Sequence, residues 1–84
     1  MSSQVWSLLR LRVVAEADPG ARARVLERFQ NLNVLPRKVV AESGIAGALY
    51  IEVDVAGVPE ETVNLIAAKL RQVPSVLNAY WHHV

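Results

Sequence analysis

The chain has 84 residues, of which 52% are hydrophobic and 20% charged, and it contains no cysteine. This length corresponds to one small domain, and nine basic against eight acidic residues lack the basic excess typical of nucleic-acid-binding domains. The lack of cysteine excludes disulfide bonds, thiolate metal ligands and a cysteine nucleophile.

The first predicted element is a strand over residues 6–15. Its side chains alternate, with Leu9, Leu11 and Val13 on one face and Leu8, Arg10 and Arg12 on the other. Alternation of this kind is typical of a half-buried strand. The Asp-Pro-Gly sequence at 18–20 then predicts a turn, and residues 1–4 are polar enough for us to expect a disordered N-terminus ahead of a single domain over 5–84.

After this turn the period changes to that of a helix. Ala21, Val25, Phe29 and Leu32 recur at helical spacing, with charged side chains mostly on the other side. Asp18 is a candidate N-cap with Pro19 at the first helical position. Either Asn31 or Asn33 can supply the left-handed residue at which such a helix ends.

Two strands follow the helix. Residues 34–42 are rich in β-branched side chains but include Pro36, which confines this strand to a sheet edge or places the proline among its first residues. Residues 43–47 form a loop. Residues 48–55 alternate clearly, with Tyr50, Glu52 and Asp54 predicted to face away from the core.

The last two elements are a helix and a strand. Gly57-Val58-Pro59 opens the second helix, whose first turn holds Glu60 and Glu61, where the helix dipole favours acidic groups. Its apolar stripe consists of Val63, Ile66, Ala67, Leu70 and Val73. The tail from 76 to 83 is apolar and aromatic enough to be a strand.

The element order β-α-β-β-α-β predicts an α+β fold of the ferredoxin-like type. This is a two-layer sandwich of one four-stranded antiparallel sheet and two helices on one face, with the first and third strands at its centre. Pairing of those strands places Arg10 and Arg12 near Asp54 and Glu52 on the helix-free face. Such cross-strand charge pairs contribute roughly 0.2–1 kcal/mol each, and the face serves either as a solvated ion ladder or as a docking surface.

The sequence offers little catalytic or metal-binding chemistry. Its only histidines, His82 and His83, are adjacent on a predicted strand and so point to opposite faces, where they cannot chelate one metal ion. No serine lies in a nucleophile-elbow pattern, and no glycine pattern cradles phosphate. We therefore expect no catalytic residues, no metal and no cofactor.

Nucleic acid and membrane are not expected partners either. The RNA-binding form of this fold stacks bases on aromatic residues of its central strands, and the third strand offers only Tyr50. No apolar stretch reaches the ~18 residues of a spanning helix, and arginines interrupt the apolar N-terminal run. The chain is expected to be cytoplasmic.

Two stretches resemble the ACT domain family. The first, LRVVAEADPGARARVLERFQNLNVLPRKVVAE, is similar to that family's first strand, its short Pro-Gly loop and a helix of the form x-R-V-x-x-x-F, with Arg24, Val25 and Phe29 at the helix positions. The second, AAKLRQVPSVLNAYW, is similar to the family's Leu-x-x-Val-x-x-Val ending of the second helix. Together they span nearly the whole chain.

Within that family the chain most resembles the small regulatory subunit of acetolactate synthase. The resemblance implies a non-catalytic module that binds a larger catalytic subunit and senses a branched-chain amino acid. It places this effector at a loop between strand and helix, in contact with a neighbouring copy. By position, the effector-binding residues are Asp18, Pro19, Gly20, Ala21, Asn33 and Leu35.

The sequence departs from valine-sensing members of that group at two places. Their loop asparagine is replaced here by Ala17 or Asp18, and their Gly-x-Asn-Ile sequence before the second strand here reads Asn-Val-Leu-Pro over 33–36. The turn at 18–20 is therefore either an effector site or a helix-capping turn. The alternative function is a free-standing dimeric amino-acid sensor without an obligate catalytic subunit.

Exposed aromatic residues on the first and last strands predict a homodimer. Trp6, Tyr80 and Trp81 are interface candidates because tryptophan and tyrosine are enriched at protein interfaces. The two tryptophans can instead cap the core of a small domain.

Overall fold

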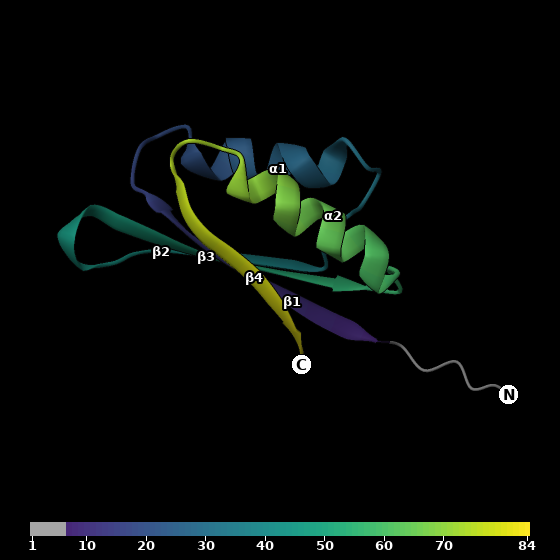
Figure 1. The fold of residues 1–84 in the computed structure, drawn as a ribbon. Helices are drawn as coiled ribbons and strands as arrows, with labels where there is room; N and C mark the ends of the chain where they lie inside the picture. The colour runs from purple at the N-terminus through teal and green to yellow at the C-terminus, as the bar shows by residue number, and fades with distance from the viewer. Residues whose placement is uncertain (1–6) are drawn as a thin grey trace, which may run out of the picture.

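The computed structural model describes residues 7–84. They form, in chain order, β1 (Leu8–Glu16), α1 (Ala21–Gln30), β2 (Lys38–Ser43), a 3-10 turn (Ile45–Gly47), β3 (Ala48–Ala56), α2 (Glu60–Arg71) and β4 (Val76–His83). The strands form one antiparallel sheet in the order β2-β3-β1-β4, and both helices lie on the same side of it (Figure 1). The ferredoxin-like α+β fold predicted from the element order is confirmed. The predictions for residues 1–4 and Trp6 lie outside the described residues.

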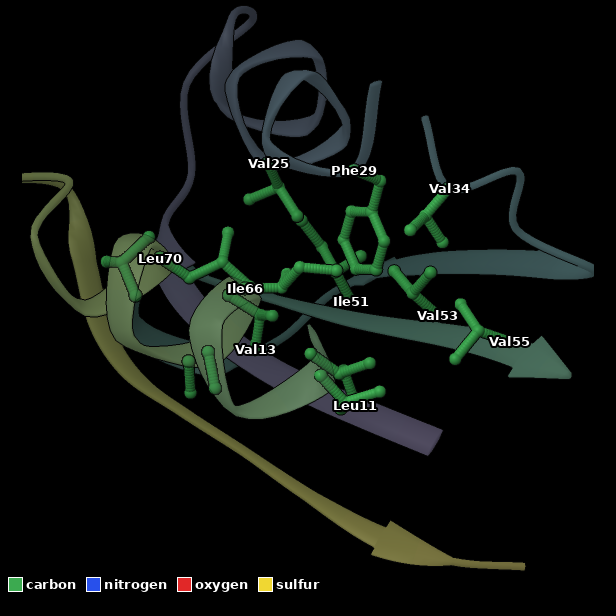
Figure 2. Packing of buried hydrophobic residues seen from close by; sticks show 14 of the residues in the cluster. Leu11, Val13, Val25, Phe29, Val34, Ile51, Val53, Val55, Ile66 and Leu70 are labelled. Atoms are coloured by element: carbon green, nitrogen blue, oxygen red, sulfur yellow. The ribbon is translucent and has the colours of Figure 1, made fainter. Parts of the chain in front are cut away.

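The core lies between the sheet and the two helices (Figure 2). Alternate residues of β1 and β3, among them Leu11 and Val53, are fully buried against Phe29 of α1 and Ile66 of α2. The predicted stripe of α2 is buried along its whole length. The two periodicities of the sequence therefore identify the buried faces correctly.

The first helix begins two residues later than predicted. Its N-cap is Gly20, so Asp18 and Pro19 lie in the preceding turn. The Asp18 side chain accepts the Gly20 N–H at 2.8 Å, and its backbone carbonyl accepts the N–H of Ala21 at 3.1 Å. Asp18 thus closes a turn ahead of the helix, as short polar side chains commonly do.

The second strand is shorter than predicted and begins at Lys38. Val34 is buried in the core, and its N–H donates to the carbonyl of Phe29 at 2.9 Å, so the chain still wraps the end of α1 at that point. Asn33, with φ of 57°, makes the left-handed exit from this helix. Pro36 therefore lies in the connection, and β2 is an edge strand as expected.

Candidate functional site

A hollow of about 250 Å³ lies beside the N-terminal end of α1. It is lined by Asp18, Pro19, Arg22, Ala41, Ser43 and Leu49. Because β1 and β2 both pair antiparallel with β3, they run in the same direction. Their C-terminal ends therefore lie at one end of the sheet, where the loop after β1 meets the end of β2.

The polar groups of this hollow carry opposite charges. Asp18 forms an ion pair with Arg24 at 2.6 Å, and both side chains are exposed. Arg22 lies in no ion pair within the described part of the chain, so its guanidinium is available. Ala41 and Leu49 add apolar surface. A carboxylate, a free guanidinium and an apolar wall together suit a small zwitterion with an apolar side chain.

The structure separates the six predicted effector residues into two groups. Asp18, Pro19, Gly20 and Ala21 precede or begin α1, whereas Asn33 and Leu35 follow its C-terminal end. A ten-residue helix is about 15 Å long, so one copy of the chain does not bring the two groups together.

The backbone of the predicted loop is also engaged internally. The N–H groups of Gly20 and Ala21 both donate to Asp18. A ligand carboxylate near this loop would therefore be held by the Arg22 side chain rather than by these two N–H groups.

Sequence reasoning missed Arg22, Ala41, Ser43 and Leu49 as lining residues of this hollow. The topology contained a signal for Ser43, because the predicted sheet already placed the ends of the first and second strands at the same edge. No such signal existed for Arg22, because the hydrophobic pattern does not distinguish it from the other exposed arginines of the same helix.

The predicted aromatic interface residues of β4 lie on opposite faces of the sheet. Tyr80 is 45% exposed on the helix-free face. Trp81 is half-buried on the helix side, packs against the core and donates its indole N–H to Asn64 at 2.7 Å. Trp81 thus packs on the core, and the two aromatic residues do not form one patch.

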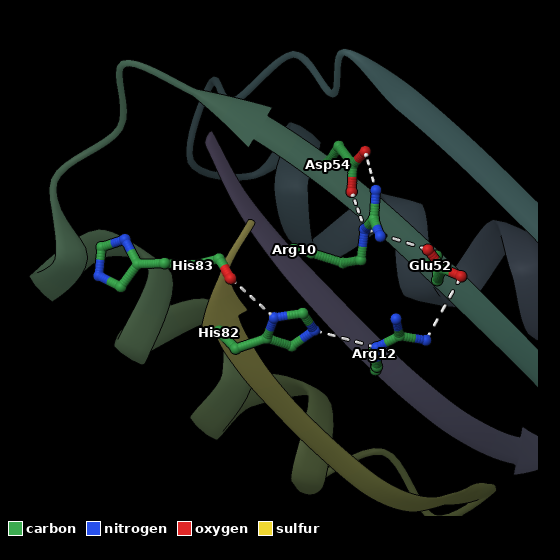
Figure 3. A network of polar contacts seen from close by, with 6 residues as sticks. All are labelled: Arg10, Arg12, Glu52, Asp54, His82 and His83. Atoms are coloured by element: carbon green, nitrogen blue, oxygen red, sulfur yellow. Dashed lines mark hydrogen bonds and ion pairs between the residues drawn. The ribbon is translucent and has the colours of Figure 1, made fainter. Parts of the chain in front are cut away.

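The helix-free face carries a network of ion pairs (Figure 3). Arg10 donates two hydrogen bonds to Asp54, at 2.8 and 3.0 Å, and lies 3.1 Å from Glu52. Arg12 pairs with the other oxygen of Glu52 at 3.4 Å. The predicted placement of these arginines beside the two carboxylates is confirmed.

The network shifts the ionisation of its buried carboxylate. The hydrogen bonds from Arg10 hold the pKa of Asp54 below its ordinary value, against the opposing effect of burial. The same contact raises the pKa of Arg10. Both groups therefore remain charged at neutral pH.

The two imidazole rings have different partners. The ring of His82 accepts a hydrogen bond from Arg12 at 3.0 Å, and its other nitrogen lies 2.9 Å from the backbone carbonyl of His83 (Figure 3). The ring of His83 lies 2.9 Å from Glu60. Over residues 7–84, no three metal-ligating side chains come together. Within the same residues, no helix is long and apolar enough to cross a membrane.

Comparison with known proteins identifies the fold but not the family. No protein-family model matches the chain, and no curated protein matches it. Among solved structures, the ACT domain of GTP pyrophosphokinase from Chlorobium tepidum is similar with a TM-score of 0.77 at 17% identity, covering 93% of this chain and 100% of that one. The C-terminal domain of the MgtC protein from Mycobacterium tuberculosis gives a TM-score of 0.76 at 16% identity, covering 100% and 94%.

A third similar structure is a much longer enzyme. Homoserine dehydrogenase from Thiobacillus denitrificans gives a TM-score of 0.74 at 20% identity, covering 94% of this chain and 17% of that one. At these identities the similarity shows the fold alone, and that fold is an ACT-like domain fold.

Proposed function

We propose that this ACT-like fold is a non-catalytic regulatory domain that binds a small amino acid beside α1 and thereby modulates a larger enzyme of amino-acid metabolism. The observation that carries the proposal is the hollow between the β1–α1 loop and the end of β2, with its carboxylate, free guanidinium and apolar wall. Support for a regulatory role comes from the similar ACT domain, which is part of a GTP pyrophosphokinase.

Each group of an amino acid has a complementary group in this hollow. Arg22 would bind the carboxylate, Asp18 would accept from the ammonium group, and Leu49 would contact an aliphatic side chain. A branched-chain amino acid fits this arrangement. Asn33 and Leu35 would reach the same ligand only from a second copy of the chain.

The sequence resemblance extends the proposal to a partner. The Leu-x-x-Val-x-x-Val ending of α2 resembles the small subunit of acetolactate synthase, so the proposed partner is the catalytic subunit of an enzyme of that type. Regulation would require the amino acid to bind two states of that complex with different affinities.

Thermal unfolding with each of the twenty amino acids tests the ligand. A ligand at about 100 times its dissociation constant adds about 2.7 kcal/mol, which raises the Tm of a small domain by several degrees. We expect this shift with valine, leucine or isoleucine. Arg22→Ala should abolish it, whereas Arg37→Ala, at another exposed arginine that lies beyond the other end of α1, should retain it.

The absence of a shift with every amino acid would contradict the proposed ligand, as would equal loss of the shift in both arginine variants. A pull-down with the acetolactate synthase catalytic subunit tests the partner separately. The charged hollow also suits a free-standing sensor, which would show the thermal shift without capturing that subunit.

A further inference from the structure

The two central strands present opposite charges on the helix-free face. Arg10 and Arg12 project from β1, and their register partners on β3 are Asp54 and Glu52. The face therefore has a positive column beside a negative column, each held in place by the ion pairs of Figure 3. Any surface that covers this face must present the opposite order of charges.

Apolar and aromatic side chains lie toward the Arg12–Glu52 end of this charged centre, whereas His82 and Lys38 flank Arg10 and Asp54 at the other end. A hollow of about 290 Å³ is lined by Val14, Val40, Tyr50 and Tyr80 together with the Arg12–Glu52 pair. The two tyrosines are 49% and 45% exposed. Neither hydroxyl has a hydrogen-bond partner within residues 7–84.

The ring of Tyr50 lies against Gly44. A Cβ atom at Gly44 would overlap this ring, so the absence of a side chain there leaves the space that the ring occupies.

We propose that this face binds the same face of a second copy, related by a two-fold axis that runs along the strands between β1 and β3. Such an axis places β1 of one copy over β3 of the other. Arg10 then lies over Asp54 of the second copy, and Arg12 over its Glu52. Because the contact is isologous, each of these attractions occurs twice.

The same axis also pairs the apolar residues. Val14 is the register partner of Tyr50, and Val40 lies in the row that ends at Tyr80. Tyr50 therefore covers Val14 of the second copy, and Tyr80 covers its Val40. Each hollow receives aromatic side chains from the opposite sheet.

The charges select this axis over the other two-fold arrangement within the face. An axis perpendicular to the strands would place β1 over β1 and β3 over β3, with arginines facing arginines and carboxylates facing carboxylates. Like-charge contacts of this kind are destabilising at an interface. The strands of the two copies should therefore run in the same sense, within about 30°.

The size of the face sets the affinity that we expect. Four strands about 4.8 Å apart and six residues of about 3.4 Å each give a face of roughly 19 by 20 Å. The two copies together would bury roughly 760 Å², which is below the about 1,200 Å² of stable specific interfaces, so we expect a weak, transient dimer with a dissociation constant in the micromolar range. The contact is separate from the amino-acid site beside α1 and is tested without ligand.

Cross-linking tests the geometry, because the chain has no cysteine of its own. The axis places Glu42, at one end of its row on β2, over Asn78 of β4 in the second copy. Both side chains are exposed, so Glu42→Cys and Asn78→Cys should fold normally. With a short bis-maleimide, an isotope-labelled Glu42→Cys chain mixed with unlabelled Asn78→Cys should give a cross-linked species containing one of each.

Failure to form this mixed species in the mass spectrum would overturn the proposed axis. Neither variant alone should form the face-to-face link. The control is a mixture of Leu35→Cys with Asn78→Cys. Leu35 is 89% exposed and lies in the α1–β2 connection, away from the proposed contact, so this mixture should give no mixed species.

Sedimentation equilibrium tests the association itself. Protein concentrations of roughly 10 to 500 µM bracket the dissociation constant that we expect. Tyr80→Glu should raise the dissociation constant at least tenfold. Leu65→Glu, a substitution of an equally exposed residue on α2, should leave it unchanged. A wild-type chain that remains monomeric, or equal weakening by both substitutions in folded variants, would overturn the proposal.

Discussion

Asp54 shows how a charged residue can belong to the interior of a sheet that helices cover on one side only. The alternation of β3 predicts that it faces away from the core, and it does. It is nevertheless only 5% exposed, because the Arg10 side chain lies across it and donates two hydrogen bonds. A residue's face follows from periodicity, but its exposure depends on the neighbouring strand.

We expect Asp54→Asn to destabilise the fold by about 1.5–3 kcal/mol, because it removes the charge of a nearly buried carboxylate that accepts two hydrogen bonds from Arg10. Urea unfolding at pH 7 measures this loss. The matched substitution Glu42→Gln, at an exposed carboxylate in no ion pair of the described residues, should change stability by less than about 0.5 kcal/mol.

The lowered pKa of Asp54 also predicts an acid dependence. A carboxyl group whose pKa is lower in the folded state contributes stability above its unfolded pKa, and this contribution is lost as the pH falls through the folded value. Stability should therefore decline below the ordinary value of 3.8. Asp54→Asn should show a shallower decline over that range, and an unchanged slope would contradict the assignment.

At the scale of elements, the connection between β2 and β3 depends on left-handed backbone. Ala46 and Gly47 have φ of 62° and 76°, and a Cβ atom at Gly47 would meet no neighbouring atom. A side chain at Gly47 would therefore be disfavoured by the positive φ of the backbone and not by a clash with neighbouring atoms. An alanine in this region costs about 1–2 kcal/mol relative to a relaxed conformation.

Two substitutions in this turn should act in opposite directions. Gly47→Ala should lower the free energy of unfolding by about 1–2 kcal/mol, because it adds a side chain at positive φ. Ala46→Gly should raise it or leave it unchanged, because it removes one. Chemical denaturation measures both, and a loss of stability in the Ala46→Gly variant would contradict the role assigned to the backbone.

At the scale of the whole molecule, a domain of 84 residues has a small core. Folding alone hides only about 60% of the surface of a chain of this size. Covering the helix-free face with a second copy would add buried surface on the side of the sheet that no helix covers. Association and stability are then linked by mass action.

Thermal unfolding should consequently depend on protein concentration. We expect the Tm of the wild-type chain to rise by a few degrees for each tenfold increase in concentration above the dissociation constant, because the folded dimer is favoured over unfolded chains. Differential scanning calorimetry measures this. The Tm of the Tyr80→Glu variant should rise less than that of the wild-type chain over the same concentrations. A wild-type chain whose Tm does not change with concentration would contradict the dimer.

The sequence by itself determined the element order, the sheet topology and the buried faces. Hydrophobic residues recur every two positions along a strand and about every 3.6 positions along a helix when one side is buried, and the strands and helices of this chain keep these two periods. The sequence also placed Arg10 and Arg12 on the same face as their carboxylates, because the alternation of buried and exposed residues on both central strands sets which side chains share a face. The last strand was predicted with its observed limits.

Only the tertiary structure decided how residues distant in sequence meet. Val34 packs into the core, so β2 begins later in the chain than predicted. Arg10 covers Asp54, and Trp81 donates a hydrogen bond to Asn64. The tertiary structure also joined the β1–α1 loop to Ser43 and Leu49 while leaving Asn33 and Leu35 at the far end of α1. Local patterns specify the direction of each side chain, whereas the contacts that make a site depend on the packing of separate elements.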